Sequence, residues 1–380
     1  MFMDLIKKSV RVIEKSQLKN GGILATPIKG AYPYIYPRDG SVMTVALNKI
    51  GETKRSEKFY YFLTKFSRLD NYKEIFHRYN IYGLPAVTRK NQNDNEGMVL
   101  WGIYDTYKAN GKISFLEDTW PLVEATVSLL KSYSKSGLIK TESSIHEFSK
   151  LERGYDIWVN SAGIRGLYDA SKIAQVVGKK KEAKEWNDLA DKLKKEMKKK
   201  LFDSKLGIYM KTGRRKDVPD ISQIAPFYFE IEGDEKILKK TLKYLREHLW
   251  YEEIGGFRRF RKFEVVDDWH WYTGGSGSWC ALTAIMGRLA KRAGEKKLYQ
   301  ECNGWLDGVA ERSGGLLPEH IATRDDYELW KMNEIEFNQR LISGSKEAEK
   351  LAKIFKENHL IYWATPLGWS HAEYILLCHE

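Results

Sequence analysis

One glutamate, Glu319, lies in a segment whose composition suits a catalytic carboxylate. The segment GGLLPEHI places Glu319 after a pair of glycines and between Pro318 and His320. Most other glutamates belong to lysine-rich patterns at helical spacing, which are typical of solvated helix faces. A general base needs a carboxylate that is fixed within reach of a water molecule. The segment therefore predicts that Glu319 activates water, with a loop ion pair as the alternative.

A second pair of polar residues, Arg38 and Asp39, follows the aromatic segment AYPYIYP. Asp39 at the start of a predicted helix can simply cap that helix. Together the two side chains can also hold neighbouring hydroxyl groups, because the guanidinium donates hydrogen bonds in a fork and the carboxylate accepts them. Both interpretations stay open from the sequence.

Aromatic residues make up 13% of the 380 residues, with 12 Trp, 22 Tyr and 15 Phe. Many stand beside Arg, Asp, His and Gly rather than in clean apolar stripes, as in GFRRFRKFEVVDDWHWYTGG and IYWATPLGWSHAEY. Aromatic planes next to fixed polar groups suit sugar rings, whose C–H faces stack and whose hydroxyls need hydrogen-bond partners. Core packing is the alternative for any single aromatic residue.

Metal and cofactor patterns are not found. The three cysteines lie far apart, the eight histidines lack ligand spacing, and neither HExxH nor GxxxxGK[ST] occurs. In GGSGSWC, Cys280 stands where a dinucleotide-binding loop needs a third glycine. We therefore expect no metal and no cofactor.

The net charge of +12 comes largely from lysines interspersed with acids at i,i+3 and i,i+4. This spacing favours solvated helix faces over a nucleic-acid surface. No stretch approaches the ~20 apolar residues of a membrane span, and the first residues lack a signal-peptide pattern. We expect a cytoplasmic chain that binds neither nucleic acid nor membranes; the sequence does not indicate its oligomeric state.

Hydrophobic periodicity near 3.6 predicts an all-α chain. The expected helices span residues 2–18, 39–50, 53–69, 94–109, 117–136, 164–178, 181–201, 219–229, 234–249, 275–293, 296–313, 345–356 and 368–379. Long aromatic, polar loops are expected at 19–38, 71–93, 138–163, 251–274 and 314–344, and loops of this kind often carry a site. Short segments such as GILATPI and GIYMK are expected to be hairpins or extended loops. Helices paired throughout, without a linker, indicate one closed domain over residues 1–380.

Six segments resemble, in order, motifs of the catalytic domain of glycoside hydrolase family 15, which includes glucoamylases, glucodextranases and related trehalases. They are YPYIYPRDGS (32–41), NQNDNEGMVLWGIY (91–104), GYDIWVNSAGIRGLYDASKIA (154–174), GGFRRF with WHWYTGGSGSWCALTA (255–284), GGLLPEHI (314–321) and TPLGWSHAEY (365–374). The resemblance implies an (α/α)6 barrel, without the N-terminal β-sandwich domain that many prokaryotic members have. It also implies a pocket for a terminal glucosyl unit and hydrolysis with inversion at the anomeric carbon.

The resemblance also implies roles for individual residues. Glu319 corresponds to the catalytic base. Arg38, Asp39 and Arg259 would hold the glucosyl ring. The aromatic walls would come from Tyr36, Trp101, Trp158 and Trp279.

One position departs from the family pattern. Val159 stands where the family has the glutamate that acts as general acid, and valine cannot donate a proton. A positioned acid typically contributes ~10²–10⁴-fold in rate. Three explanations stay open: another acid replaces it, the substrate has a good leaving group, or the protein binds sugar without efficient cleavage. The candidate substitute acids are Glu152, Asp156, Asp267 and Asp268.

The sequence therefore predicts an inverting, exo-acting hydrolase of α-linked glucosides or oligosaccharides, with glycosidic linkage and chain length undetermined. The alternative is a non-catalytic sugar-binding or regulatory barrel.

Overall fold

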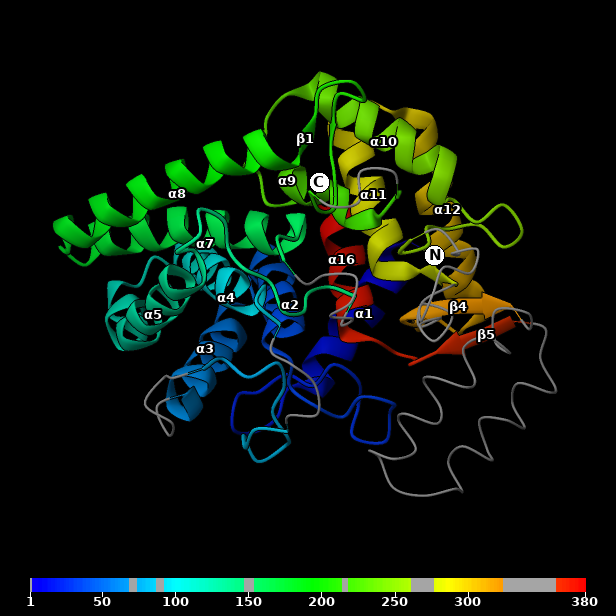
Figure 1. Ribbon diagram of the computed structural model, residues 1–380. Coiled ribbons are helices and arrows are strands. Elements are labelled where there is room, and N and C mark those ends of the chain that lie inside the picture. The colour runs from blue at the N-terminus through cyan, green and yellow to red at the C-terminus, as the bar shows by residue number, and fades with distance from the viewer. Residues whose placement is uncertain are drawn as a thin grey trace.

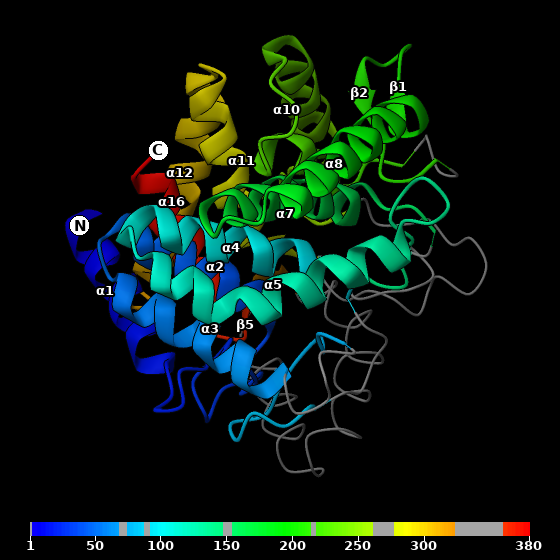
Figure 2. The ribbon, with the colours of Figure 1, turned by 90° about the vertical axis from the view of Figure 1, so that its left-hand side faces the viewer.

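The computed structural model describes residues 2–67, 74–86, 92–146, 154–213, 218–260, 277–323 and 360–380. Within these ranges the helices form an inner and an outer layer (Figures 1 and 2). The inner layer contains α2 (Pro37–Lys49), α4 (Asn95–Asn110), α7 (Ile157–Val176), α9 (Ala225–Tyr228), α11 (Cys280–Arg292) and α16 (Gly368–Cys378). The outer layer contains α1 (Phe2–Ser16), α3 (Thr53–Ser67), α5 (Ile113–Tyr133), α8 (Lys180–Leu201), α10 (Glu235–Leu249) and α12 (Lys296–Arg312).

The inner helices form a closed ring. Each contacts the next in chain order, from α2 through α4, α7, α9 and α11 to α16, and α16 packs back against α2. Outer helices cover this ring: α3 and α5 lie in front of α2 and α4 in Figure 2, and α8 packs on α7. A short 3-10 helix, η2 (Ile221–Ile224), leads into α9. This arrangement is an (α/α)6 barrel, so the predicted fold is confirmed.

The two layers follow from the distribution of apolar residues. The outer helix α8 buries one stripe at a spacing of three or four residues, and its other side is rich in lysine. The inner helix α7 is buried along nearly its whole length, because neighbours cover it on every side. No helix among the described residues has both the length and the apolar composition needed to cross a membrane.

Two glycines allow α4 and α7 to approach each other closely. A Cβ atom at Gly97 would lie 2.2 Å from the carbonyl oxygen of Ala162, and one at Gly166 would lie 2.7 Å from the Cα of Gly97. Real Cβ contacts are not this short, so any side chain at either position would push the two helices apart. Glycine is therefore required at position 97 because α4 and α7 pack closely there.

The boundary of α7 differs from the expectation. The sequence predicted a loop over 138–163, but α7 begins at Ile157. The carboxylate of Asp156 accepts hydrogen bonds from the backbone N–H groups of Trp158 and Val159, which caps the helix there. The apolar residues of DIWVN face neighbours on all sides, so they show no amphipathic period that would mark them as helical.

Short strands were the least predictable elements. GIYMK does form part of a hairpin, in which β1 (Phe202–Asp203) pairs with β2 (Ile208–Tyr209). An antiparallel sheet of order β3-β4-β5 also forms, from Ser278–Trp279, His320–Thr323 and Leu360–Trp363. The strands at 278–279 and 320–323 replace a predicted helix start and part of a predicted loop. The helix expected at 345–356 lies outside the described residues.

Candidate functional site

Among the described residues, an outer helix stands between each inner helix and the next and returns the chain, so the inner helices begin at the same end of the barrel. This end therefore gathers the segments before the inner helices. Arg38 and Asp39 lie in the first turn of α2, Asp94 and Asp156 are the N-caps of α4 and α7, and Trp279 precedes α11. Helix N-termini carry partial positive charge and favour carboxylates.

Glu319 lies at this end, between two strands. Its backbone N–H donates to the carbonyl of Trp363 at 2.9 Å, and its carbonyl accepts from the N–H of Cys280 at 3.1 Å. The hydroxyl of Tyr32 donates to its carboxylate at 3.3 Å, and the indole N–H of Trp363 donates to that hydroxyl at 2.6 Å. The side chain is 16% exposed. Glu319 is thus a fixed carboxylate that keeps access to solvent, as a general base requires.

The residue after Glu319 connects it to two other predicted site residues. His320 Nδ1 lies 3.3 Å from the Glu319 carboxylate, and its ring stacks on Trp279 with centroids 5.2 Å apart. The Arg259 guanidinium lies 4.2 Å from the centroid of the Trp279 ring. The structure therefore brings Glu319, Trp279 and Arg259 together. It adds Tyr32, His320 and Trp363 to the same set.

The segment before Glu319 is anchored to α16. Ser370 donates to the carbonyl of Pro318 at 2.7 Å, and the N–H of Leu317 donates to His371 Nε2 at 3.0 Å. The other ring nitrogen of His371 lies 2.8 Å from the hydroxyl of Ser9. An imidazole that accepts from a backbone N–H must be neutral, and burial lowers the pKa of His371 to about 3. The SHA part of the TPLGWSHAEY segment therefore positions the candidate base.

This geometry predicts an acid-sensitive fold. Because the pKa of His371 is lower when folded than its ordinary value of 6.5, the unfolded chain binds its proton more readily. The contribution of neutral His371 to the free energy of unfolding is therefore fully present above about pH 6.5. It falls by ~1.4 kcal/mol per pH unit as the pH drops from there toward the pKa of His371 in the folded chain. We expect urea unfolding at pH 7, 6 and 5 to show this slope in the wild type and a shallower slope in His371→Gln. Equal slopes would contradict the assignment.

Arg38 and Asp39 are buried next to each other, with Arg38 Nε 3.3 Å from Asp39 Oδ1. Arg38 also lies 3.5 Å from the Asp94 carboxylate, donates to the carbonyl of Ser144 at 3.4 Å, and lies 5.4 Å from the Trp369 ring centroid. These contacts come from three further segments, so the guanidinium is fixed rather than free to swing. The pair offers fixed donors and acceptors of the kind that hold hydroxyl groups.

Tyr36 lies beside this pair and is 7% exposed. Its hydroxyl accepts a hydrogen bond from Arg78 at 3.2 Å, and the Arg78 guanidinium covers the ring of Tyr34 at 4.2 Å. Arg78 was not singled out from the sequence. Its loop contains no motif that separates a site residue from a solvated arginine.

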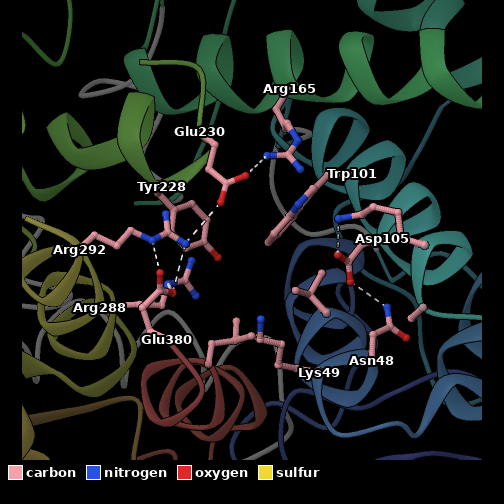
Figure 3. Close-up of a pocket in the computed structure, with 14 residues that line it drawn as sticks. Asn48, Lys49, Trp101, Asp105, Arg165, Tyr228, Glu230, Arg288, Arg292 and Glu380 are labelled. Atoms are coloured by element: carbon pink, nitrogen blue, oxygen red, sulfur yellow. Dashed lines mark hydrogen bonds and ion pairs between the residues drawn. The ribbon is translucent and has the colours of Figure 1, made fainter. Parts of the chain in front are cut away.

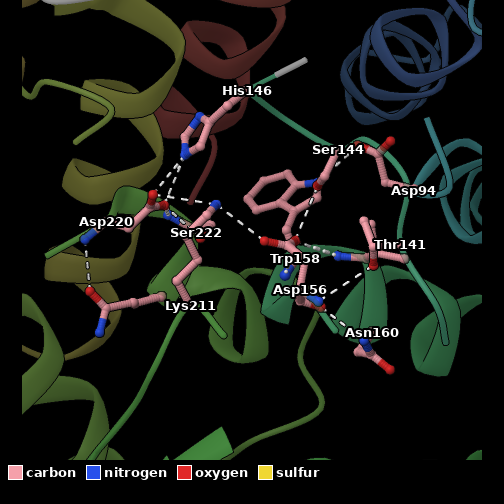
Figure 4. A network of polar contacts seen from close by, with 12 residues as sticks. Asp94, Thr141, Ser144, His146, Asp156, Trp158, Asn160, Lys211, Asp220 and Ser222 are labelled. Atoms are coloured by element: carbon pink, nitrogen blue, oxygen red, sulfur yellow. Dashed lines mark hydrogen bonds and ion pairs between the residues drawn. The ribbon is translucent and has the colours of Figure 1, made fainter. Parts of the chain in front are cut away.

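A buried polar network joins the starts of α7 and η2 (Figure 4). The ammonium of Lys211 lies 3.1 Å from the Asp156 carboxylate and 3.3 Å from the Asp220 carboxylate. His146 Nε2 lies 2.9 Å from both carboxylate oxygens of Asp220. Burial outweighs that attraction and lowers the pKa of His146 to about 3, so the imidazole is neutral. Burial opposes charge on Asp220 too, but His146, Lys211 and Ser222 together lower the pKa of its carboxyl.

This network reaches the predicted sugar-binding arginine, because Arg259 donates to the carbonyl of His146 at 3.5 Å. Lys211, His146 and Asp220 were missed in the sequence. Lys211 stands in the GIYMK segment, where a lysine after a short strand looks like a surface residue. Only the folded chain shows that it is 4% exposed between two carboxylates.

The position to which the family resemblance assigns the general acid holds a buried apolar residue. Val159 is fully buried in the first turn of α7. Of the candidate substitutes, Asp156 is also fully buried, and it accepts hydrogen bonds from two backbone N–H groups and from Ser144 besides pairing with Lys211. Asp156 is therefore better explained as a helix cap. Glu152, Asp267 and Asp268 lie outside the described residues.

Two of the predicted aromatic wall residues, Trp101 and Trp158, pack against the same tyrosine, Tyr228. Trp158 is fully buried, stacks on Tyr228 at 5.3 Å, and donates its indole N–H to Asp94 at 3.1 Å. Trp101 packs edge-on against the same Tyr228 at 5.9 Å, two turns into α4. Both rings thus pack against Tyr228 in the interior of the barrel, where Trp158 is fully buried and Trp101 is 6% exposed.

Comparisons with known proteins agree with this architecture. Residues 131–255 match the Mannosylglycerate hydrolase MGH1-like glycoside hydrolase domain. A curated relative, the Uncharacterized glycosyl hydrolase MJ1610 of Methanocaldococcus jannaschii, is 24% identical over 367 residues. That match covers 95% of this chain and 53% of the relative, so the chain spans about half the relative's length.

Solved structures show the same fold. A glycosidase variant in complex with glucose matches with a TM-score of 0.75 at 18% identity, covering 99% of this chain and 96% of that one. A bacterial glucoamylase complexed with acarbose matches with a TM-score of 0.70 at 16% identity, covering 99% and 55%. These findings confirm the predicted resemblance to glucoamylase-like catalytic barrels.

Proposed function

We propose that the chain hydrolyses α-linked glucosides at the barrel end that holds Glu319, with inversion of configuration. Its similarity to glycoside hydrolases of the glucoamylase-like type supports this proposal. The observation that supports this most directly is the environment of Glu319. Its backbone is hydrogen-bonded to Trp363 of β5 and to Cys280 at the start of α11, its carboxylate accepts from Tyr32, and it remains partly exposed. Such a carboxylate is built to receive a proton from a water molecule.

In the proposed reaction, a Glu319 oxygen removes one proton from water while the water oxygen attacks the anomeric carbon. The bond from that carbon to the leaving oxygen breaks, and the leaving oxygen keeps the electron pair. Tyr32 fixes the direction of the carboxylate, because its own hydroxyl is held by the Trp363 indole. Attack from the face opposite the leaving group gives the inverted anomer.

The sugar would be held by groups that are already rigid. Arg38 and Asp39 supply paired donors and acceptors for neighbouring hydroxyls, and Arg259 supplies further donors beside the Trp279 ring. Rigid groups cost little conformational entropy when a ligand binds, which favours affinity for a small, polar glycosyl unit.

The described residues of this site offer no side chain that is well placed to protonate the leaving group. Val159 has no proton to give, and Asp156 is committed to capping α7 and to Lys211. We propose that substrates whose leaving group needs little protonation react best. An acid from Glu152, Asp267 or Asp268 would extend the reaction to ordinary disaccharides.

The buried Val159 also favours a second candidate function, a barrel that binds a glucosyl unit without efficient cleavage. This version keeps the roles of Arg38, Asp39 and Arg259 but gives Glu319 only a hydrogen-bonding one. It predicts that Glu319→Gln retains the wild-type affinity for sugar.

The test compares α-glucosyl fluoride with maltose, isomaltose and trehalose under identical conditions. Fluoride leaves with little help from an acid, so we expect its kcat to exceed that of the disaccharides by ~10²–10⁴-fold, the usual contribution of a general acid. Comparable kcat values would show that another residue supplies the proton. No turnover of any of the four, with measurable sugar binding, would favour the binding function.

A further inference from the structure

A cavity of about 300 Å³ lies at the barrel end opposite Glu319, where the inner helices finish (Figure 3). All six inner helices contribute to its lining, and residues from the ends of α2, α4, α11 and α16 dominate it. We call it the arginine pocket, after Arg165, Arg288 and Arg292. Its volume is at the lower end of the range for small-molecule sites, which is about 300–1,000 Å³.

The lining of the arginine pocket has an excess of positive charge. Its cationic side chains are the three arginines with Lys49 and Lys108, and its carboxylate side chains are Asp105, Glu230 and Glu380. Two positive charges therefore remain in excess among these side chains. Helix C-termini attract cations, which accounts for basic residues in the last turns. It does not require a buried arginine.

Arg288 is that buried arginine, at 4% exposure. Its Nη1 donates to Glu373 at 3.2 Å, and its Nε lies 3.5 Å from Glu380 without making a hydrogen bond to any described residue. A buried guanidinium N–H without an acceptor is costly, because it has given up water. Arg288 thus has donor capacity that the described protein groups do not use.

The other two arginines converge on one carboxylate. Glu230 lies 2.8 Å from Arg165 and 3.3 Å from Arg292, and Figure 3 shows it between these guanidinium groups. Arg292 also pairs with Glu380. Planar guanidinium forks around an oxyanion are the arrangement by which proteins bind phosphate as well as carboxylate. Glu230 and Glu380 are exposed enough to move aside, at 54% and 21%.

The rest of the wall is aromatic and polar. Trp101 and Tyr228 line the pocket together with Asn48 and Asp105. An aromatic plane beside hydroxyl-binding groups suits a small polyhydroxylated body attached to the anion.

We propose that the arginine pocket binds the phosphate monoester of a small sugar or polyol, with the phosphate on the arginines and the hydroxylated part against Trp101. The site is separate from the one that contains Glu319. The inference holds whether or not the chain is a hydrolase.

The test is isothermal titration at low ionic strength with glucose 6-phosphate, glucose and inorganic phosphate as the probes. We expect saturable binding of glucose 6-phosphate, at least tenfold tighter than that of inorganic phosphate and undiminished by excess maltose. Equal affinity for inorganic phosphate would overturn the assignment of a monoester. If maltose displaced glucose 6-phosphate, or if glucose 6-phosphate did not saturate the protein below ~10 mM, the proposal of a separate phosphate-binding pocket would be overturned.

Two charge changes at the pocket should act in opposite directions. Arg292→Gln removes a fork to the phosphate and should weaken binding about tenfold or more. Glu230→Gln removes a competing negative charge and should tighten binding severalfold. The control is Lys195→Ala on the exposed face of α8, which should leave the affinity unchanged.

Lys49 is an exposed residue of the pocket. If Arg292→Gln is unstable, Lys49→Ala should still weaken binding twofold or more. Changes in the same direction at 230 and 292 would contradict the proposal.

Discussion

Glu319→Gln is expected to lower kcat for α-glucosyl fluoride by ~10²–10⁴-fold, the range for loss of a general base. The amide cannot accept a proton from water. It can still accept the hydrogen bond from Tyr32, so the backbone hydrogen bonds of residue 319 to Trp363 and Cys280 should persist. KM should change little, because the variant removes a group that acts on water rather than on the sugar. Steady-state kinetics with a fluoride-selective electrode measures both quantities.

The matched control is Glu311→Gln, which makes the same chemical change at an exposed position near the end of α12. Its kcat should equal that of the wild type. A Glu319→Gln variant that retained a tenth or more of wild-type kcat would show that Glu319 is not the base.

The second large effect concerns stability. Lys211→Met should lower the free energy of unfolding by ~3–5 kcal/mol, because it leaves the buried carboxylates of Asp156 and Asp220 without their shared cation. Methionine has a similar length, so the loss would reflect charge rather than a cavity. Urea unfolding followed by circular dichroism at pH 7 measures it.

Lys198→Met is the control for this prediction. Lys198 pairs with Glu232 at 3.3 Å, but its side chain is 54% exposed, and surface pairs of this kind contribute ~0–1 kcal/mol. Adding Asp220→Asn to Lys211→Met should recover part of the lost stability, since it removes one of the two stranded charges. A loss below ~1 kcal/mol for Lys211→Met would contradict the described network.

The architecture could be predicted because its causes are local. The outer helix α8 is amphipathic and rich in lysine because one side faces solvent. The inner helix α16 has almost no charged residues because neighbours bury it along nearly its whole length. The candidate base was equally visible, since Glu319 stands in a loop between Pro318 and His320 instead of on a lysine-rich face.

Other features depend on contacts between distant segments. Trp101 and Trp158 look like sugar-stacking residues in the sequence, and only the folded chain shows that both rings pack against Tyr228. The three strands beside Glu319 are short and come from segments far apart in the chain, so no local alternation marks them. Lys211 acquires its role only when α7 and η2 place Asp156 and Asp220 around it.

The most direct test of the central claim is the configuration of the glucose first released from α-glucosyl fluoride. Proton NMR resolves the two anomers before they equilibrate. A water molecule activated by Glu319 on the face opposite the leaving group gives β-glucose, and the account predicts that β-glucose appears first and vanishes in Glu319→Gln. α-Glucose as the first product, or β-glucose formed equally fast by the variant, would contradict it.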